Sequence, residues 1–175
     1  MSKGSDRIKP WVESFPADVE AMKKALESNG AEGAREMVAG ALNYLITRMD
    51  LIPDWEETAG ILDDAMVLRV AAAMASENGL DASPEVGRLA NEADAVADLL
   101  GAELYPRFKK HVEGLAGQAV RGRHPKQIVE DPKVRATLFV EIGDELKRIP
   151  PAPVADVDAV TRTVKNYLSK KLGGK

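Results

Sequence analysis

Apolar residues recur at intervals of three and four along most of the chain, which is the spacing of amphipathic helices. The pattern is strongest in residues 41–75, where a helix end is followed by the turn Asp-Leu-Ile-Pro-Asp and then by the most apolar helix. Residues 62–75 are apolar on nearly every side apart from Arg69, as is typical of a helix at the centre of a bundle. The sequence shows no strand pattern and no internal repeat. It therefore predicts an all-α, single-domain helical bundle of about six to seven helices around this buried central helix.

Proline, glycine and capping residues set the expected limits of each segment. Residues 1–14 are expected to form a flexible N-terminal tail, and the first helix to begin at Ser14 or Pro16 with Asp18 near its positive end. Further helices are expected over residues 32–48, 61–78, 125–129 and 131–149, and from residue 83 onward with a kink near Gly101 and Pro106. Residues 15–149 would then form the bundle.

The C-terminal part is expected to begin with a stiff Pro-rich linker, residues 150–154. Residues 155–175 follow as an amphipathic helix, whose apolar face carries Val157, Val160, Val164, Leu168 and Leu172. This face is expected to pack on the bundle or on a partner.

The amino-acid composition excludes several classes of protein. The chain has 175 residues and no cysteine, which excludes disulfide scaffolds, thiolate zinc sites and cysteine nucleophiles. Its apolar runs are far shorter than the roughly 20 residues that span a bilayer, and its N-terminus does not resemble a signal peptide. We therefore expect a cytoplasmic protein.

Charge is distributed in blocks. Residues 50–64 hold six acidic side chains and no basic one, whereas residues 107–126 hold six lysines and arginines and one glutamate. Such blocks either face different partners or face each other.

The segment YLITRMDLIPDWEETAGILDDAMVL resembles a bacterial family of unknown function, the YkvA-like domain. The shared features are the pair Tyr44-Leu45, the turn from Asp50 to Asp54, then Gly60 and the pair Asp63-Asp64. The resemblance covers about residues 34–75, and the family usually has a proline where Arg48 stands. It implies a small helical module without a settled activity.

The acidic turn is the first candidate site. Asp50, Asp54, Asp63 and Asp64 could together hold Mg²⁺, Mn²⁺ or Ca²⁺, and the metal could then orient a phosphate ester for hydrolysis. A structural role is favoured instead, because Asp54 can cap a helix and Asp63 and Asp64 would lie at the positive end of the next one. No histidine lies near in sequence and no known metal-loop spacing matches.

The basic segment is the second candidate. Arg121, Arg123 and Lys126 could bind an anion such as a phosphate, but a solvated loop or one paired with acidic residues is favoured. Its lack of stacking aromatic residues and the net charge of −4 argue against nucleic acid. His111 could act as an acid or base but is expected to be a solvated surface residue, and His124 is expected to cap or turn the chain.

No set of residues indicates a particular reaction, so the favoured function is a non-enzymatic protein–protein interaction or adaptor module. Its partner would be another protein or a second copy of the chain. The alternatives are the metal-dependent enzyme described above and a peripheral membrane protein that binds lipid through the last helix. The membrane alternative is not favoured, because that helix offers small valines and alanines to the bilayer.

Overall fold

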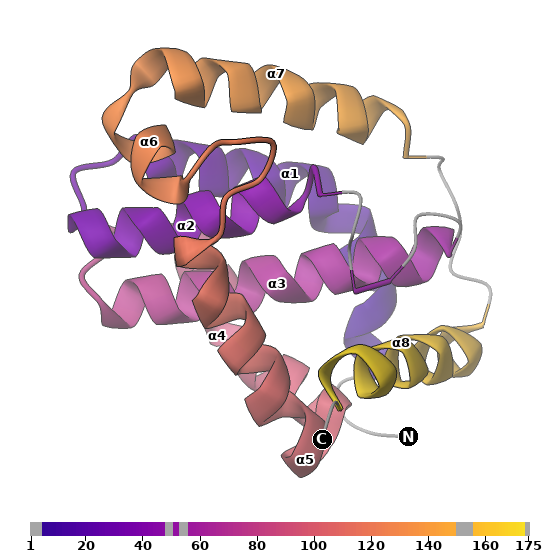
Figure 1. Cartoon of the computed structure of the whole chain (residues 1–175). Helices are drawn as coiled ribbons and strands as arrows, with labels where there is room; N and C mark the ends of the chain where they lie inside the picture. The colour runs from indigo at the N-terminus through magenta and orange to yellow at the C-terminus, as the bar shows by residue number, and fades with distance from the viewer. Residues whose placement is uncertain (1–4, 48–50, 53–55, 150–155, 174–175) are drawn as a thin grey trace.

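The computed structural model describes residues 5–47, 51–52, 56–149 and 156–173 (Figure 1). The elements in chain order are η1 (Ser5–Arg7), α1 (Ile8–Leu26), α2 (Glu32–Tyr44), α3 (Glu57–Glu77), α4 (Pro84–Asn91), α5 (Ala93–Gly114), η2 (Leu115–Gly117), α6 (Pro125–Glu130), α7 (Pro132–Lys147) and α8 (Val157–Leu172). Within these ranges there is no strand, only an isolated bridge between Val120 and Arg123. The predicted all-α helical bundle is confirmed.

Helix α3 lies at the centre of the bundle. It packs against α1, α2, α4, α5 and α8 (Figure 1). Leu62, Met66, Val67 and Leu68 are wholly buried although they point in different directions around the helix. A helix covered on all sides must be apolar on all sides, which explains the missing polar stripe in its sequence.

The N-terminal helix is longer than the sequence suggested. α1 begins at Ile8, so residues 8–14 are helical and do not belong to a flexible tail. Ile8, Trp11 and Phe15 are buried at helical spacing, and this apolar contact outweighs the presence of Pro16 inside the helix. Asp18 consequently lies in the interior of α1 and not at its positive end.

Other helix ends differ from the predicted ones by a few residues. α2 ends at Tyr44, so the expected continuation to Arg48 ends early, and Arg48 itself lies outside the described residues. α3 begins at Glu57 instead of residue 61. The helix expected from residue 83 onward is two helices, α4 and α5, and α5 has the expected kink at Gly101, whose φ is +83°.

The C-terminal helix α8 packs against α3 and α5. Val164 and Leu168 are buried, and the Tyr167 hydroxyl donates a hydrogen bond to Glu56 at 3.3 Å. The Pro-rich linker expected at residues 150–154 lies outside the described residues.

Gly40 allows a close approach between α2 and η2. A Cβ atom at Gly40 would lie 2.6 Å from the carbonyl oxygen of Leu115 and 2.8 Å from the amide nitrogen of Ala116. Both are backbone atoms, so they cannot move aside as a flexible side chain would. The approach brings the end of α5 against α2, the helix that carries Tyr44.

We predict that Gly40→Ala lowers the free energy of unfolding by about 1–3 kcal/mol, because the added methyl group forces α2 and η2 apart. Gly33→Ala in the same helix is the matched control, since a Cβ there meets nothing within 4 Å. It should be neutral or stabilising by up to about 1 kcal/mol, through the better helix propensity of alanine. Urea denaturation of both variants measures the difference, and equal stability would contradict the close contact.

Candidate functional site

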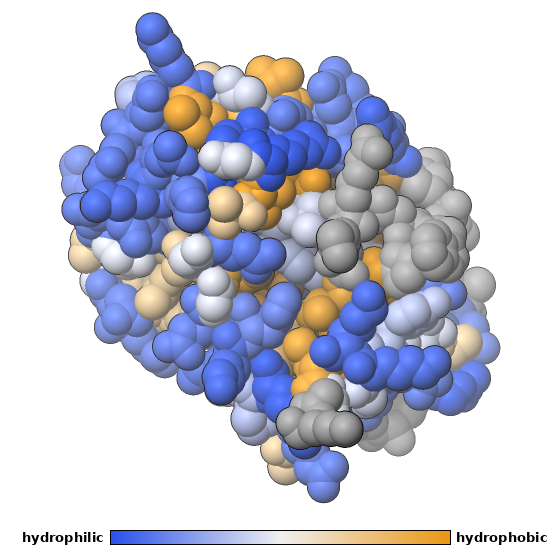
Figure 2. Space-filling model, in the orientation of Figure 1, coloured by the Kyte–Doolittle hydropathy of each residue, from blue (hydrophilic) through white to orange (hydrophobic). Residues whose placement is uncertain are grey.

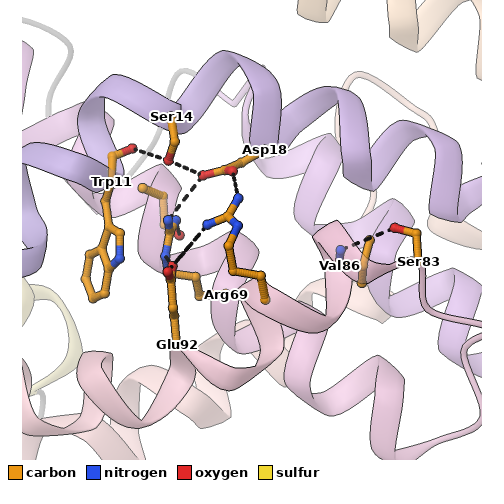
Figure 3. A network of polar contacts seen from close by, with 9 residues as sticks. Trp11, Ser14, Asp18, Arg69, Ser83, Val86 and Glu92 are labelled. Carbon is orange, nitrogen blue, oxygen red and sulfur yellow. Dashed lines mark hydrogen bonds and ion pairs between the residues drawn. The ribbon is translucent and has the colours of Figure 1, made fainter.

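Two buried polar clusters lie on α3. The first, which we call the Arg69 cluster, consists of Arg69, Asp18, Arg88 and Glu92 (Figure 3). Arg69 donates to Asp18 at 3.1 Å and to Glu92 at 2.8 Å, and its side chain is wholly buried. Arg88 donates to the other carboxylate oxygen of Asp18 at 2.5 Å. The cluster therefore joins α1, α3, α4 and the α4–α5 junction.

The Arg69 cluster is electrostatically complete. Two guanidinium groups face two carboxylates, the Ser14 hydroxyl donates to Asp18 at 2.8 Å, and the Trp11 ring lies 4.6 Å from the guanidinium carbon of Arg69. Burial lowers the pKa of Arg69, and the charges of Asp18 and Glu92 oppose that effect. Because its charges are matched inside the protein, the cluster holds helices together and offers no free group for chemistry.

We predict that Asp18→Ala destabilises the protein by up to about 3–5 kcal/mol, because Arg69 keeps its buried charge and loses one of its two carboxylates. Glu13→Ala on the same helix is the control. Glu13 pairs with Lys9 at 3.9 Å with both side chains more than half exposed, so its removal should cost less than about 1 kcal/mol. Chemical denaturation compares the two, and an Asp18→Ala protein as stable as Glu13→Ala would refute the structural role.

The second cluster is the Tyr44–Asp63 pair, which joins the end of α2 to α3. The Tyr44 hydroxyl donates to Oδ2 of Asp63 at 2.5 Å and accepts a hydrogen bond from the Leu51 amide at 3.0 Å. Asp63 is wholly buried, and within the described residues its Oδ1 has no hydrogen-bond partner. One hydroxyl thus connects α2, the residue 51 turn and α3.

The electrostatics of this pair differ from those of the Arg69 cluster. Burial raises the pKa of Asp63 to about 7, and the hydrogen bond from Tyr44 acts in the opposite direction. Burial also raises the pKa of Tyr44, as do the neighbouring carboxylates of Asp63 and Asp64, so the tyrosine stays protonated. Within the described residues no lysine, arginine or histidine forms an ion pair with Asp63. A buried carboxyl without a cation near it is a candidate functional group.

His111 of α5 completes the surroundings of Tyr44. The two ring centroids are 5.8 Å apart with an edge-to-face angle of 77°. Within the described residues Nε2 of His111 is buried without a hydrogen-bond partner, and burial lowers the pKa of the imidazole. The expectation of a solvated surface histidine is therefore corrected. The signal was present in the sequence, because position 111 continues the apolar spacing of Leu104, Phe108 and Leu115.

The four carboxylates predicted as metal ligands are only partly described. Asp50 and Asp54 lie outside the described residues, while Asp63 and Asp64 are adjacent in α3. The expected position of Asp63 and Asp64 in the first helical turn is corrected, since α3 begins at Glu57 and places them in its second turn. Among the described side chains no three histidines or carboxylates are grouped to hold a metal ion. A site for Mg²⁺, Mn²⁺ or Ca²⁺ built from all four stays a prediction.

The predicted anion-binding residues Arg121 and Arg123 lie just before α6, and Lys126 lies in α6. Arg121 and Arg123 both pair with Glu141 of α7, and the Asn43 side chain donates to the Arg123 carbonyl at 3.1 Å. The hydrogen bond from Arg123 lowers the pKa of Glu141. Lys126 lies 3.9 Å from Glu130 on the surface, and His124 is the N-cap residue of α6, as predicted. Anion binding by these three cations stays a prediction, and it would compete with Glu141.

The fold and the site define the class of protein. It is an all-α bundle whose central helix carries two buried polar clusters. Residues 34–69 match a protein-family model described as "Protein of unknown function (DUF1232)". This segment contains most of α2 and the first part of α3, including Tyr44, Asp63 and Arg69. The YkvA-like resemblance falls in the same segment, and that name stays a prediction. No curated protein and no solved structure matches the chain.

In the part of the chain that the structure describes, no helix has both the length and the apolar character needed to cross a bilayer.

We predict that Tyr44→Phe lowers the free energy of unfolding by about 1–3 kcal/mol, because it leaves the Leu51 amide and Asp63 without their partner. Tyr105→Phe is the matched control, since within the described residues the Tyr105 side chain is only partly buried and has no hydrogen bond. It should change stability by less than about 0.5 kcal/mol. Thermal and urea denaturation test this, and equal effects of the two substitutions would rule out the proposed bridging role.

Proposed function

We propose that the chain is a non-enzymatic protein–protein interaction module and that the outer face of α7 is its contact surface. The observation that carries the proposal is the position of α7. This helix lies on the outside of the bundle, packed on α6, and only Leu138 and Ile142 are buried (Figure 1). The charged groups of the bundle interior are matched to each other in the Arg69 cluster, which supports a structural use for them rather than catalysis.

The outward face of α7 has the spacing of a helix-pairing surface. Five of its exposed residues follow one another at alternating intervals of four and three, namely Lys133, Thr137, Val140, Asp144 and Lys147. Val140 is 65% exposed, which is unusual among the large hydrophobic residues described. Figure 2 shows apolar atoms among charged ones over α7. The surface is therefore a narrow apolar centre with charged ends.

A second copy of α7 is the partner that this charge pattern fits best. If two copies pair antiparallel with a centre between positions 138 and 139, Lys133 of one copy faces Asp144 of the other. The same arrangement sets Val140 against Thr137, and the small side chain of Ala136 lets the helices approach. One helix face buries little area, so the proposed dimer is weak and transient.

Sedimentation velocity over a concentration series tests the proposal. We expect wild-type protein to associate reversibly at concentrations up to about 1 mM. Lys133→Glu and Asp144→Lys should each weaken association by at least about threefold, through charge repulsion at two symmetric positions. The double variant Lys133→Glu/Asp144→Lys restores opposite charges and should recover the wild-type constant.

Two further variants separate α7 from other surfaces. Val140→Glu places a charge at the centre of the face and should abolish association, while Ala102→Glu, an exposed position on α5, should leave it unchanged. A wild-type protein that stays monomeric throughout the series contradicts self-association. Dimers that are insensitive to all α7 variants would show that the contact lies elsewhere.

A further inference from the structure

A tight turn that carries two arginines lies between η2 and α6 (Figure 1). The Val120 amide donates to the Arg123 carbonyl at 2.9 Å, and the Arg123 amide donates to the Val120 carbonyl at 3.0 Å. The two central residues have positive φ, +51° at Arg121 and +77° at Gly122, as in a type I′ turn. The buried Asn43 of α2 donates to the Arg123 carbonyl at 3.1 Å and thereby fixes the turn to the bundle.

Arg121 occupies a position that is unfavourable for an arginine. Among the described residues it is the only non-glycine residue with a positive φ. Glycine, asparagine or aspartate would fit this position with less strain, so the turn by itself does not explain an arginine there. Its ion pair does not explain it either. Nη1 of Arg121 lies 3.4 Å from Glu141, the two side chains are 38% and 27% exposed, and such exposed pairs add little stability.

Arg121 and Arg123 together hold one carboxylate. Nη1 of Arg121 pairs with Oε1 of Glu141, and Nη2 of Arg123 pairs with Oε2. Two guanidinium groups directed at separate oxygens of one oxyanion form an arrangement that also suits a phosphate group. A strained backbone that places a charged side chain in such an arrangement indicates a use other than stability.

We propose that Arg121 and Arg123 form a binding site for a phosphate group, and that the Glu141 carboxylate closes this site until the phosphate displaces it. A phosphate group carries up to about two negative charges and has at least three acceptor oxygens, so it binds two guanidinium groups more strongly than a carboxylate does. The partial exposure of Arg121 and Glu141 gives the anion access. The site does not use the outer face of α7, so this proposal is independent of self-association.

Displacement of Glu141 leaves the other contacts of α7 in place. This helix also packs on α6, and its Leu138 and Ile142 are buried. The ring centroid of Phe139 lies 4.9 Å from the Lys23 ammonium of α1. None of these contacts involves the two arginines. Phosphate binding should therefore turn the Glu141 side chain towards solvent while α7 stays packed, and the Glu141 carboxyl carbon reports that change.

Lys126, the third predicted anion-binding residue, is not part of this site. It lies 3.9 Å from Glu130 of the same helix, and the two side chains are 65% and 55% exposed. Water and salt screen a charge in that position, so its removal should leave phosphate binding unchanged. Lys126 therefore supplies the matched control.

Titration of the full-length protein with inorganic phosphate, followed by NMR at a constant ionic strength of about 0.1 M, tests the proposal. The amides of Gly122 and Arg123 and the carboxyl carbon of Glu141 should shift with one common midpoint below about 5 mM. Acetate should cause no such shift up to about 20 mM, because it has no advantage in charge over the tethered Glu141 carboxylate.

Methyl phosphate in a parallel titration distinguishes the two sources of the phosphate group. Binding as tight as that of inorganic phosphate identifies a site for phosphate monoesters, in which one oxygen is free to carry a substituent. Exclusion of methyl phosphate identifies a site for the free ion.

Arg121→Asn separates binding from folding. Asn-Gly is a preferred pair for a type I′ turn, so this variant should be at least as stable as wild type in urea denaturation. It should nevertheless bind phosphate at least about tenfold more weakly. Glu141→Gln removes the internal competitor and should bind phosphate at least about fivefold more tightly, whereas Lys126→Gln should bind it as wild type does.

Four results would overturn the proposal. The first is a wild-type midpoint above about 5 mM, and the second is a shift at Gly122 and Arg123 without one at the Glu141 carboxyl carbon. The third is an Arg121→Asn protein less stable than wild type, which would show that the arginine serves the fold. The fourth is a Lys126→Gln protein weakened as much as Arg121→Asn, which would indicate general attraction to a basic surface. The wild-type titration decides the first two even if a variant fails to fold.

Discussion

The ion pair between Arg69 and Asp18 is the constraint on which the arrangement of the bundle depends. Arg69 lies in the middle of a helix that is covered on every side, so its charge has to be matched by another buried group. Asp18 meets this need from α1 and Glu92 meets it from the α4–α5 junction. The pairing fixes where α1 crosses α3, and it brings the Trp11 ring over the guanidinium group. Apolar contacts are less directional than such a hydrogen-bonded ion pair.

The Tyr44–Asp63 pair lies on the same central helix and follows the opposite electrostatic principle. In the Arg69 cluster each charge has an opposite charge within hydrogen-bonding distance. Asp63 has a neutral hydroxyl instead, and burial raises its pKa to about 7. The interior of α3 therefore carries paired charges at Arg69, whereas its second turn carries a buried carboxyl that has no opposite charge among the described residues. Tyr44, Asp63 and Arg69 lie in the segment that matches a family of unknown function, whereas Asp18 and Glu92 lie outside it.

The buried charged groups and the surface residues of the bundle have different roles. The interior charges hold helices to one another. In the proposed function, contact with other molecules falls to an outer face, that of α7, which combines an exposed Val140 with charges of both signs. An interaction module of this kind needs no catalytic group. In that proposal, specificity would come from the order of side chains along α7.

How far the sequence predicted the site depends on the range of the interactions. Periodicity identified α3 as the central helix, and proline and glycine placed most helix ends and the kink at Gly101, because these signals are local. Asp63 was singled out as a metal ligand or helix cap, and the metal role stays a prediction; its expected position in the first helical turn was wrong because α3 starts earlier, at Glu57. His111 was assigned to the surface, although its spacing from Phe108 and Leu115 placed it on the inner face.

The chain's own order of residues thus determined that it is helical and where its central helix lies. Only the tertiary structure decided which side chains interact with one another. Arg69 meets Asp18 across 51 positions and Tyr44 meets Asp63 across 19, and neither distance leaves a periodic trace in the sequence. The reason is physical: helix formation depends on neighbours three and four residues away, whereas the environment of a buried charge depends on which helices happen to enclose it.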